Sequence, residues 1–271
     1  MDKEKNRKQA GDSMHHFFVD ASDINTEEKT IRIAGENLNH LKNVLRVRIG
    51  ERVLLSAGEG TDYVCTVQEI GAQEIITHID FQEEEHELPM EICLFQGLPK
   101  SDKMEFIIQK AVELGASRII PVETKNAVVR LDEKKAAKKT ERWQNIAEAA
   151  AKQSKRSVIP EVGSVLTWKE AMQCMPEYDI RLIPYENARG MAATLDLAKE
   201  ICEAVREQKR LKIAVFIGPE GGFSETEIRD AEGQGIVSIS LGKRILRTET
   251  AAIVSLSALM LLLETACIAA E

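Results

Sequence analysis

Two short segments near the C-terminus each adjoin a run of β-branched apolar residues, and they constrain the fold more than any other part of the chain. The first segment, Phe216-Ile-Gly-Pro-Glu-Gly-Gly-Phe223, overlaps the apolar run 213–217. The second, Leu241-Gly-Lys-Arg-Ile-Leu-Arg-Thr-Glu-Thr250, follows the apolar run 236–239. Such runs are typical of buried parallel strands, and ligands bind at the carboxyl ends of strands in a parallel sheet. The two segments are therefore predicted to be loops of one binding site.

Strands and helices alternate along residues 89–271. Apolar runs predict strands at 92–98, 118–122, 178–183, 213–217 and 236–239. Apolar residues at helical spacing predict helices at 103–114, 132–153, 168–172 and 191–206, and two more from residues 224 and 248 onward. Thr167 is a candidate N-cap, and Ser224-Glu-Thr-Glu227 is a candidate capping box. This alternation predicts an α/β domain with a mostly parallel sheet covered on both faces.

The N-terminal third of the chain has a different pattern. Expected strands at 30–33, 52–56, 63–70 and 74–79 are closely spaced, with one short helix at 36–45. This pattern predicts a small β-barrel spanning residues 14–84, separate from the α/β domain at 89–271. The acidic segment 81–89, which ends in proline, is the predicted linker between them. Residues 1–13 are polar and charged, and we expect a disordered tail.

The composition limits the classes of function that are possible. A net charge of −8 argues against a general nucleic-acid binder, but the charge is uneven, with 14 basic and 8 acidic residues between positions 100 and 156. The cysteines and histidines show no spacing typical of a metal site, and with no signal peptide the chain is expected to be cytoplasmic. The apolar run 251–263 is short for a membrane span, so a core helix is expected there.

The two loops carry complementary chemistry. Glycines in the first loop, Gly218, Gly221 and Gly222, are expected to adopt conformations closed to other residues, and a valine at Gly221 to fill the pocket. The second loop contains three basic residues, Lys243, Arg244 and Arg247. Neither loop matches a P-loop or a GxGxxG pattern. We therefore expect a cofactor site beside an anionic substrate, with further phosphate contacts from the basic segment 148–156.

Several motifs resemble the RsmE family of ribosomal RNA methyltransferases, of the SPOUT superfamily. They lie at 40–46, 97–104, 110–115, 148–156, 216–225 and 241–251, in the family's order, and the resemblance extends over residues 14–267. It implies a PUA-like RNA-binding β-barrel followed by an α/β domain with a trefoil knot. It also implies a homodimer that uses S-adenosylmethionine (SAM) to methylate N3 of one uridine in the 16S rRNA of the small ribosomal subunit.

The resemblance also assigns roles to residues. The implied SAM-binding residues are Pro184, Tyr185, Glu186, Gly218, Pro219, Glu220, Gly221, Gly222, Ser240, Leu241, Gly242, Ile245, Leu246 and Arg247. The implied RNA-binding residues are His40, Arg46, Lys100, Lys103, Lys152, Gln153, Ser154 and Arg156. Because uridine N3 must lose a proton, Arg247 is expected to stabilise the developing anion and Glu249 or Glu220 to accept the proton.

Three alternatives are compatible with the residues alone. The first is an RNA-binding module that does not use the pocket, and the second is a dinucleotide-dependent oxidoreductase, although the chain lacks an early glycine-rich turn. The third is a SPOUT enzyme that acts on transfer RNA. For the quaternary state, the last helix at 248–267 is apolar nearly all round, so we expect it to contribute to a dimer interface.

Overall fold

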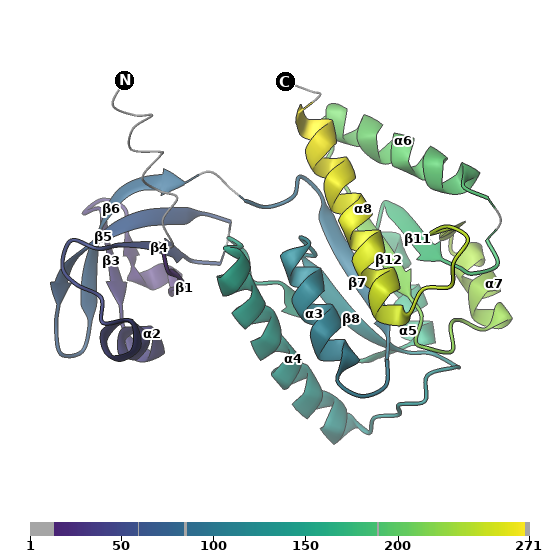
Figure 1. Cartoon of the computed structure of the whole chain (residues 1–271), viewed down its shortest axis with the longest axis horizontal. Coiled ribbons are helices and arrows are strands. Elements are labelled where there is room, and N and C mark those ends of the chain that lie inside the picture. Colours follow the sequence, from purple (N-terminus) through teal and green to yellow (C-terminus); the bar gives the residue numbers. More distant parts are fainter. Residues whose placement is uncertain (1–13, 59, 84–85, 189, 269–271) are drawn as a thin grey trace. The chain divides into compact units, whose positions relative to one another are not determined.

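The computed structural model describes residues 14–58, 60–83, 86–188 and 190–268 (Figure 1). The tail predicted at 1–13 lies outside these residues. The chain divides into two compact units, of which the first comprises Met1–Glu87 and Lys152–Ile159 and the second comprises Leu88–Ala151 and Pro160–Glu271. The division falls inside the predicted linker, but it also assigns the last residues of the long basic helix and the short segment after it to the first unit.

The first unit is a curled six-stranded sheet around its own apolar core. Its strand order is β1-β4-β5-β6-β3-β2, and only the β1–β4 pair is parallel. The core contains Ile31, Ile33, Leu41, Leu55 and Cys65. The strands are β1 (His16–Phe18), β2 (Ile24–Asn25), β3 (Thr30–Ile33), β4 (Arg52–Ser56), β5 (Asp62–Ile70) and β6 (Ile75–Glu83).

Two elements of the first unit differ from the prediction. The expected helix at 36–45 is α-helical only over α2 (Gly35–Asn39) and continues as the π-helical turn η2 (His40–Leu45). The turn ends at Arg46, whose φ of 54° places it in the left-handed region. Strand β6 continues to Glu83, so the connecting segment is shorter than the acidic composition suggested.

The second unit is an α/β domain whose described strands all pair in parallel, which confirms the predicted class. The order is β10-β8-β7-β12-β11-β13, with β9 beside β8. The strands are β7 (Glu91–Gly97), β8 (Arg118–Glu123), β9 (Glu161–Val162), β10 (Leu166–Thr167), β11 (Ile180–Pro184), β12 (Lys212–Ile217) and β13 (Val237–Ile239). The helices are α3 (Lys103–Glu113), α4 (Glu133–Ser154), α5 (Trp168–Gln173), α6 (Ala192–Arg206), α7 (Glu225–Gly233) and α8 (Thr248–Ile268). The trefoil knot stays a prediction.

Local sequence explains how these elements begin and pack. Ser224 forms the predicted capping box at the start of α7, and Thr167, predicted as an N-cap, forms a complete capping box with Glu170 at the start of α5. Phe95 and Phe216 on adjacent strands stack with ring centroids 4.5 Å apart and pack against α5 and α7. On the other side, α8 packs between α3 and α6. The sheet is therefore covered on both faces.

Helix α8 has two unlike sides. Residues at helical spacing are buried against the rest of the second unit, namely Ala252, Leu256, Leu259 and Leu263. Val254 and Leu261 on the outer side are exposed. By length and composition alone, Thr248–Ala266 could cross a membrane, and 33% of its most apolar stretch is buried. The expectation of a core helix therefore holds for one side of α8 only.

Candidate active site

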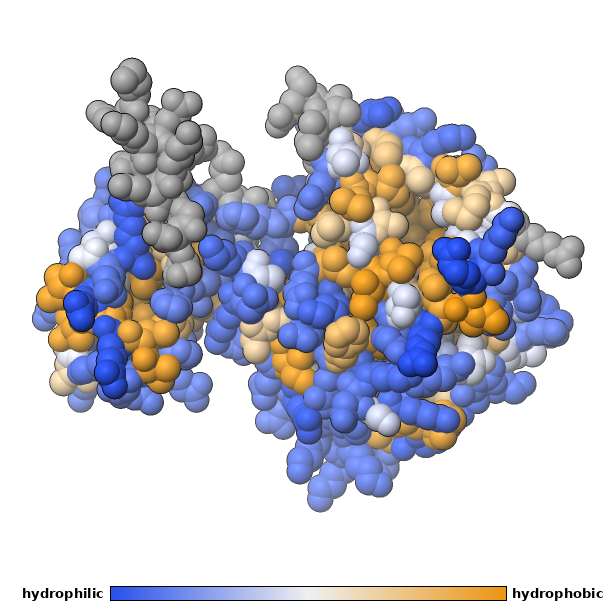
Figure 2. Space-filling view, in the orientation of Figure 1, coloured by the Kyte–Doolittle hydropathy of each residue, from blue (hydrophilic) through white to orange (hydrophobic). Residues whose placement is uncertain are grey.

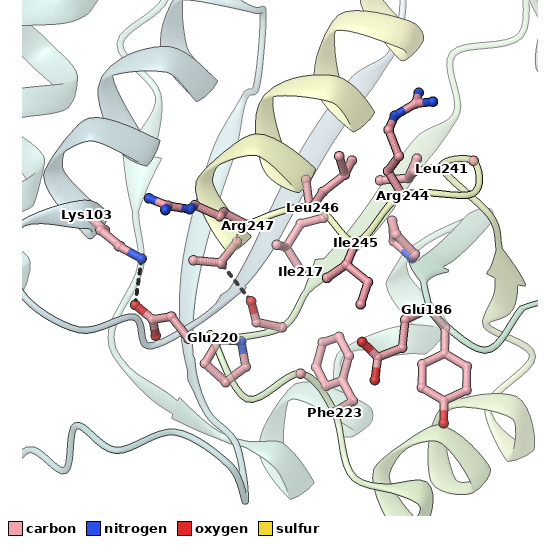
Figure 3. A pocket seen from close by; sticks show the side chains of 18 of the residues that line it. Lys103, Glu186, Ile217, Glu220, Phe223, Leu241, Arg244, Ile245, Leu246 and Arg247 are labelled. Atoms are coloured by element: carbon pink, nitrogen blue, oxygen red, sulfur yellow. Dashed lines mark hydrogen bonds and ion pairs between the residues drawn. The ribbon is translucent and has the colours of Figure 1, made fainter.

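A cavity of about 400 Å³ lies at the carboxyl ends of β11, β12 and β13, where three loops meet (Figure 3). All the predicted SAM-binding residues line it except Gly221 and Ser240. Its wall also contains Lys103, Ile217, Phe223, Lys243, Arg244, Thr248 and Ala251, which were not predicted as cofactor contacts. The two loops identified in the sequence therefore meet at one site, together with the loop that follows β11.

The glycine loop is built differently from the expectation. Only Gly222 has a positive φ, of 63°, and a Cβ there would meet nothing within 4 Å. At Gly221 a Cβ would lie 3.0 Å from Asn126 Cβ, and Asn126 Nδ2 donates a hydrogen bond to the Gly221 carbonyl. Gly221 therefore faces Asn126 rather than the cavity, and Gly222 is the position in this loop whose backbone conformation favours glycine.

Ser240 shapes the second loop without lining the cavity. Its backbone N–H donates to Thr194 Oγ1 at 3.2 Å, and Thr194 Oγ1 donates to its carbonyl at 3.1 Å. Its hydroxyl oxygen accepts the N–H of Gly242 at 3.2 Å. These bonds hold the loop at its start, where it leaves β13.

Thr248 joins the two cofactor loops. Its hydroxyl donates to the Gly218 carbonyl at 2.6 Å and accepts a hydrogen bond from Gln96 Nε2 at 3.0 Å. Gln96 is fully buried at the end of β7. Sequence reasoning missed this pair, although a lone glutamine in an apolar strand was a signal, because a buried amide requires partners.

Lys103 forms an ion bridge at the edge of the cavity. Its Nζ lies 3.0 Å from Glu220 Oε1 and 3.3 Å from Glu249 Oε2. The hydrogen bond to Glu220 is the largest cause that raises the pKa of Lys103. Burial acts to raise the pKa of Glu220, but hydrogen bonds from backbone N–H groups and from Lys103 outweigh it, so that pKa is lowered. Lys103, which was expected to contact RNA, is thus paired with two carboxylates of its own chain.

The second loop supplies positive charge to the cavity wall. Lys243, Arg244 and Arg247 are exposed, and none of them forms an ion pair with another described residue. Figure 3 shows Arg247 between the Lys103 bridge and Leu246. An anionic ligand entering the cavity would therefore meet cations that no carboxylate of the described chain neutralises.

The other predicted RNA-binding residues lie in four places. His40 and Arg46 are exposed around η2, and Lys152, Gln153 and Ser154 end α4. Lys100 contacts Glu220 through its backbone N–H. Arg156 is 5% exposed, and its guanidinium forms an ion pair with Glu87. A phosphate contact by Arg156 does not fit this arrangement, because its charge is already paired and buried.

Comparisons with known proteins identify the relatives of this chain. Residues 86–260 match an RNA methyltransferase domain family, and residues 33–80 match an RNA methyltransferase PUA domain family. Ribosomal RNA small subunit methyltransferase E of Bacillus subtilis (strain 168) is 36% identical over 91% of this chain and 96% of its own length.

Two solved structures are similar over nearly the whole chain. The Neisseria gonorrhoeae ribosomal RNA small subunit methyltransferase E bound to S-adenosyl methionine has a TM-score of 0.76 at 31% identity, covering 92% of this chain and 98% of its own. A putative methyltransferase of Legionella pneumophila in complex with SAM has a TM-score of 0.73 at 30% identity, with the same coverage. The chain belongs to the ribosomal RNA small subunit methyltransferase E family.

Proposed function

We propose that this protein transfers a methyl group from SAM to N3 of one uridine in the 16S rRNA of the small ribosomal subunit, in the cytoplasm. The observation that carries this proposal is the cavity where the glycine loop and the Lys243–Arg247 loop meet. Two relatives of similar structure bind SAM. The relatives' names supply the small-subunit substrate, and the family resemblance supplies the base and the atom.

The residues of the cavity fit SAM. A volume of about 400 Å³ is within the usual range for small-ligand sites. Leu241, Leu246 and Phe223 provide apolar surface for a flat adenine ring, and the bare backbone at Gly222 allows close approach. Glu186 is exposed on the wall, where its carboxylate favours a positively charged group. SAM supplies an electrophilic methyl group on a sulfonium centre.

The chain's own residues supply the proton transfer and the charge stabilisation. The bond between N3 and the methyl carbon forms as the S–C bond of SAM breaks. The electron pair of the S–C bond goes to sulfur, and the N3 proton goes to a base. Both Glu220 and Glu249 contact Lys103 Nζ, but Glu220 also accepts the backbone N–H of Lys100, and its hydrogen bonds lower its pKa, so Glu249 is the proposed base. Arg247 stabilises the negative charge that develops on the uracil ring.

We further propose that the protein acts as a homodimer through the outer side of α8. Figure 2 shows an apolar band along α8, and Leu261 of this helix is 56% exposed. A helix that leaves leucine and valine side chains in water is stabilised when a second copy covers them. In the first unit, His40, Arg46, Lys152 and Gln153 are the proposed RNA contacts.

Nucleoside analysis tests the proposed function directly. Small-subunit rRNA from cells that lack the protein should lack one N3-methyluridine, and the purified protein with SAM should restore it. Transfer RNA from the same cells is the control for the alternative substrate, and a difference there would favour the transfer RNA enzyme. Absence of heat on SAM titration would instead support a binding module, and an unchanged rRNA would refute the proposal.

A further inference from the structure

The first half of α4 carries a dense group of exposed lysines that the cavity does not explain. These residues, which we call the lysine face, are Lys134, Lys135, Lys138 and Lys139. The buried side of α4 consists of Trp143, Ala147, Ala150 and Ala151. Figure 2 shows a hydrophilic surface over the start of this helix. The lysine face therefore belongs to the solvent side of the second unit.

The lysine face acts against the stability of its own helix. Residues four positions apart are neighbours on a helix, so Lys134 lies beside Lys138 and Lys135 beside Lys139, and like charges at this spacing are destabilising. Cations near the N-terminus of a helix also oppose its dipole. An arrangement that costs the helix stability is explained when the lysines bind an anion outside the chain.

Acidic residues of the chain neutralise this group only in part. Lys135 Nζ lies 2.9 Å from Asp132 Oδ2, in an ion pair. Lys139 Nζ lies 5.7 Å from the ring centre of Trp143, in a cation–π contact. Lys134 and Lys138 form no ion pair with any residue that the structure describes. Lys134 and Lys138 are therefore available to bind an anion, and Lys135 is held only by one exposed ion pair of low strength.

The chain leads into α4 from the carboxyl end of β8, at the same edge of the parallel sheet as the cavity. The segment that leads into α4 is fastened to the cofactor loop, because Asn126 Nδ2 donates to the Gly221 carbonyl at 3.0 Å. Lys125 N donates to Glu227 Oε1 at 2.7 Å, just beyond the same loop. The chain from Asn126 to Lys134 can span at most about 28 Å. RNA with a base in the cavity can therefore reach these lysines.

We propose that the lysine face binds the phosphate backbone of the RNA whose target base enters the cavity, several nucleotides away from that base. This inference rests on the proposed function. Lysine ammonium groups on flexible stems suit phosphates without reading the base sequence. The lysines therefore add affinity and orientation to the catalytic unit itself, separately from the proposed contacts of the first unit.

The test compares two variants of the full chain, each of which loses three positive charges. Lys134→Gln, Lys135→Gln and Lys138→Gln are combined in one variant. The matched control combines Lys169→Gln, Lys199→Gln and Lys209→Gln, which removes the same charge from exposed positions on or after α5 and α6. The probes are unmethylated small ribosomal subunits and protein-free 16S RNA, measured by filter binding over a salt series.

The lysine-face variant should bind both probes at least tenfold more weakly, and its salt dependence should fall by about two to three units of slope, one for each lost phosphate contact. The control should stay within about twofold of the wild-type affinity, and arginine at the three lysine positions should restore binding. SAM affinity and the methylation rate at saturating RNA should not change, and the melting temperature should not fall.

Equal RNA affinity of the lysine-face variant and the control would overturn this inference. Loss of binding to subunits but not to protein-free RNA would also overturn it, because the lysines would then contact a ribosomal protein. Failure of the wild-type protein to methylate either probe would refute the proposed function instead. The two failures are therefore distinguishable in one set of measurements.

Discussion

At the residue scale, Thr248 gives the sharpest prediction about the cofactor site. Thr248→Val keeps the shape but removes the hydroxyl that holds the Gly218 carbonyl and accepts from buried Gln96. A buried group left without its partner costs about 1–3 kcal/mol, so SAM should bind about tenfold more weakly. Calorimetry should show this in a folded protein, and Thr248→Ser should bind normally. Equal affinities of the two variants would contradict the role.

Arg247 is predicted to act in the chemical step. Arg247→Ala should lower the single-turnover methylation rate at saturating RNA and SAM by the loss of about 3 kcal/mol of transition-state stabilisation, roughly a hundredfold. RNA affinity should be nearly retained. Lys243→Ala removes a charge from the same loop and is the control, with a normal rate at saturation. A normal rate for Arg247→Ala would make Arg247 a binding residue only.

The sequence predicted most of the cavity wall but not how its charges are paired. Loop residues close together in sequence, such as Leu241 and Arg247, stay together after folding. By contrast, Lys103 pairs with Glu249 and Arg156 pairs with Glu87, and both pairs are far apart along the chain. Only the folded arrangement shows that these cations are already neutralised, because a charged residue in a sequence does not identify its partner.

At the element scale, the glycine loop should depend on Gly222 more than composition suggests. Gly222→Val places a β-branched residue at φ 63° in the wall of the cavity, so SAM binding should weaken at least tenfold. Gly233→Val at the end of α7, where φ is not positive and a Cβ meets nothing, is the control and should bind SAM normally. Normal SAM binding by Gly222→Val would refute this account of the loop.

Helix α8 is the element that tests the proposed dimer. Leu261→Glu puts a charge on the outer side of α8, and Leu195→Glu is the matched control on α6, since these leucines are 56% and 57% exposed. If the outer side of α8 is the interface, light scattering should show a monomer for the first variant and a dimer for the second, because an unpaired buried charge is unfavourable. A monomeric wild-type protein would disprove the dimer.

Elements were predictable where local sequence decides them. The N-cap at Thr167 and the capping box at Ser224 form as predicted, because a cap is made by residues three positions apart. The π-helical turn at His40–Leu45 was not predictable, since its apolar spacing also suits an α-helix. The buried and exposed sides of α8 could not be predicted either. Its sequence is apolar all round, so it does not indicate which side packs against the rest of the chain.

At the scale of the whole molecule, the segment after α4 is fastened into the first unit. The Ser157 hydroxyl donates to Asp62 Oδ2 at 2.7 Å, and the Ser157 carbonyl accepts from Ser56 Oγ at 3.0 Å. Glu87 accepts the backbone N–H groups of Ser157 and Val158. The contacts of Ser157 with Asp62 and Ser56 join residues about a hundred positions apart in the sequence. Composition along the chain does not show such contacts, so it could not predict that this segment belongs with the N-terminal sheet.

The buried group around Asp62, which accepts the Ser157 hydroxyl, predicts that stability depends on pH. His16 is buried beside Asp62, with Nε2 3.9 Å from Oδ1, and Asp62 also faces His86. Burial is the largest cause that lowers the pKa of His16; Asp62 opposes it, and Lys152, Lys155 and His86 add to it. A lowered pKa means that the folded state favours the neutral ring, so this contribution to stability is present above about pH 6.5 and is lost as the pH falls below it.

His16→Phe tests that sign, because phenylalanine fills a ring-sized space and cannot be protonated. The wild-type melting temperature should fall between about pH 7 and pH 5 more steeply than that of the variant, since only the wild-type chain must bury a proton-binding ring. His15→Phe, at the neighbouring position outside the buried strand, should keep the wild-type steepness. If the melting temperature of His16→Phe falls with pH as steeply as that of the wild-type chain, protonation of His16 does not cause the pH dependence.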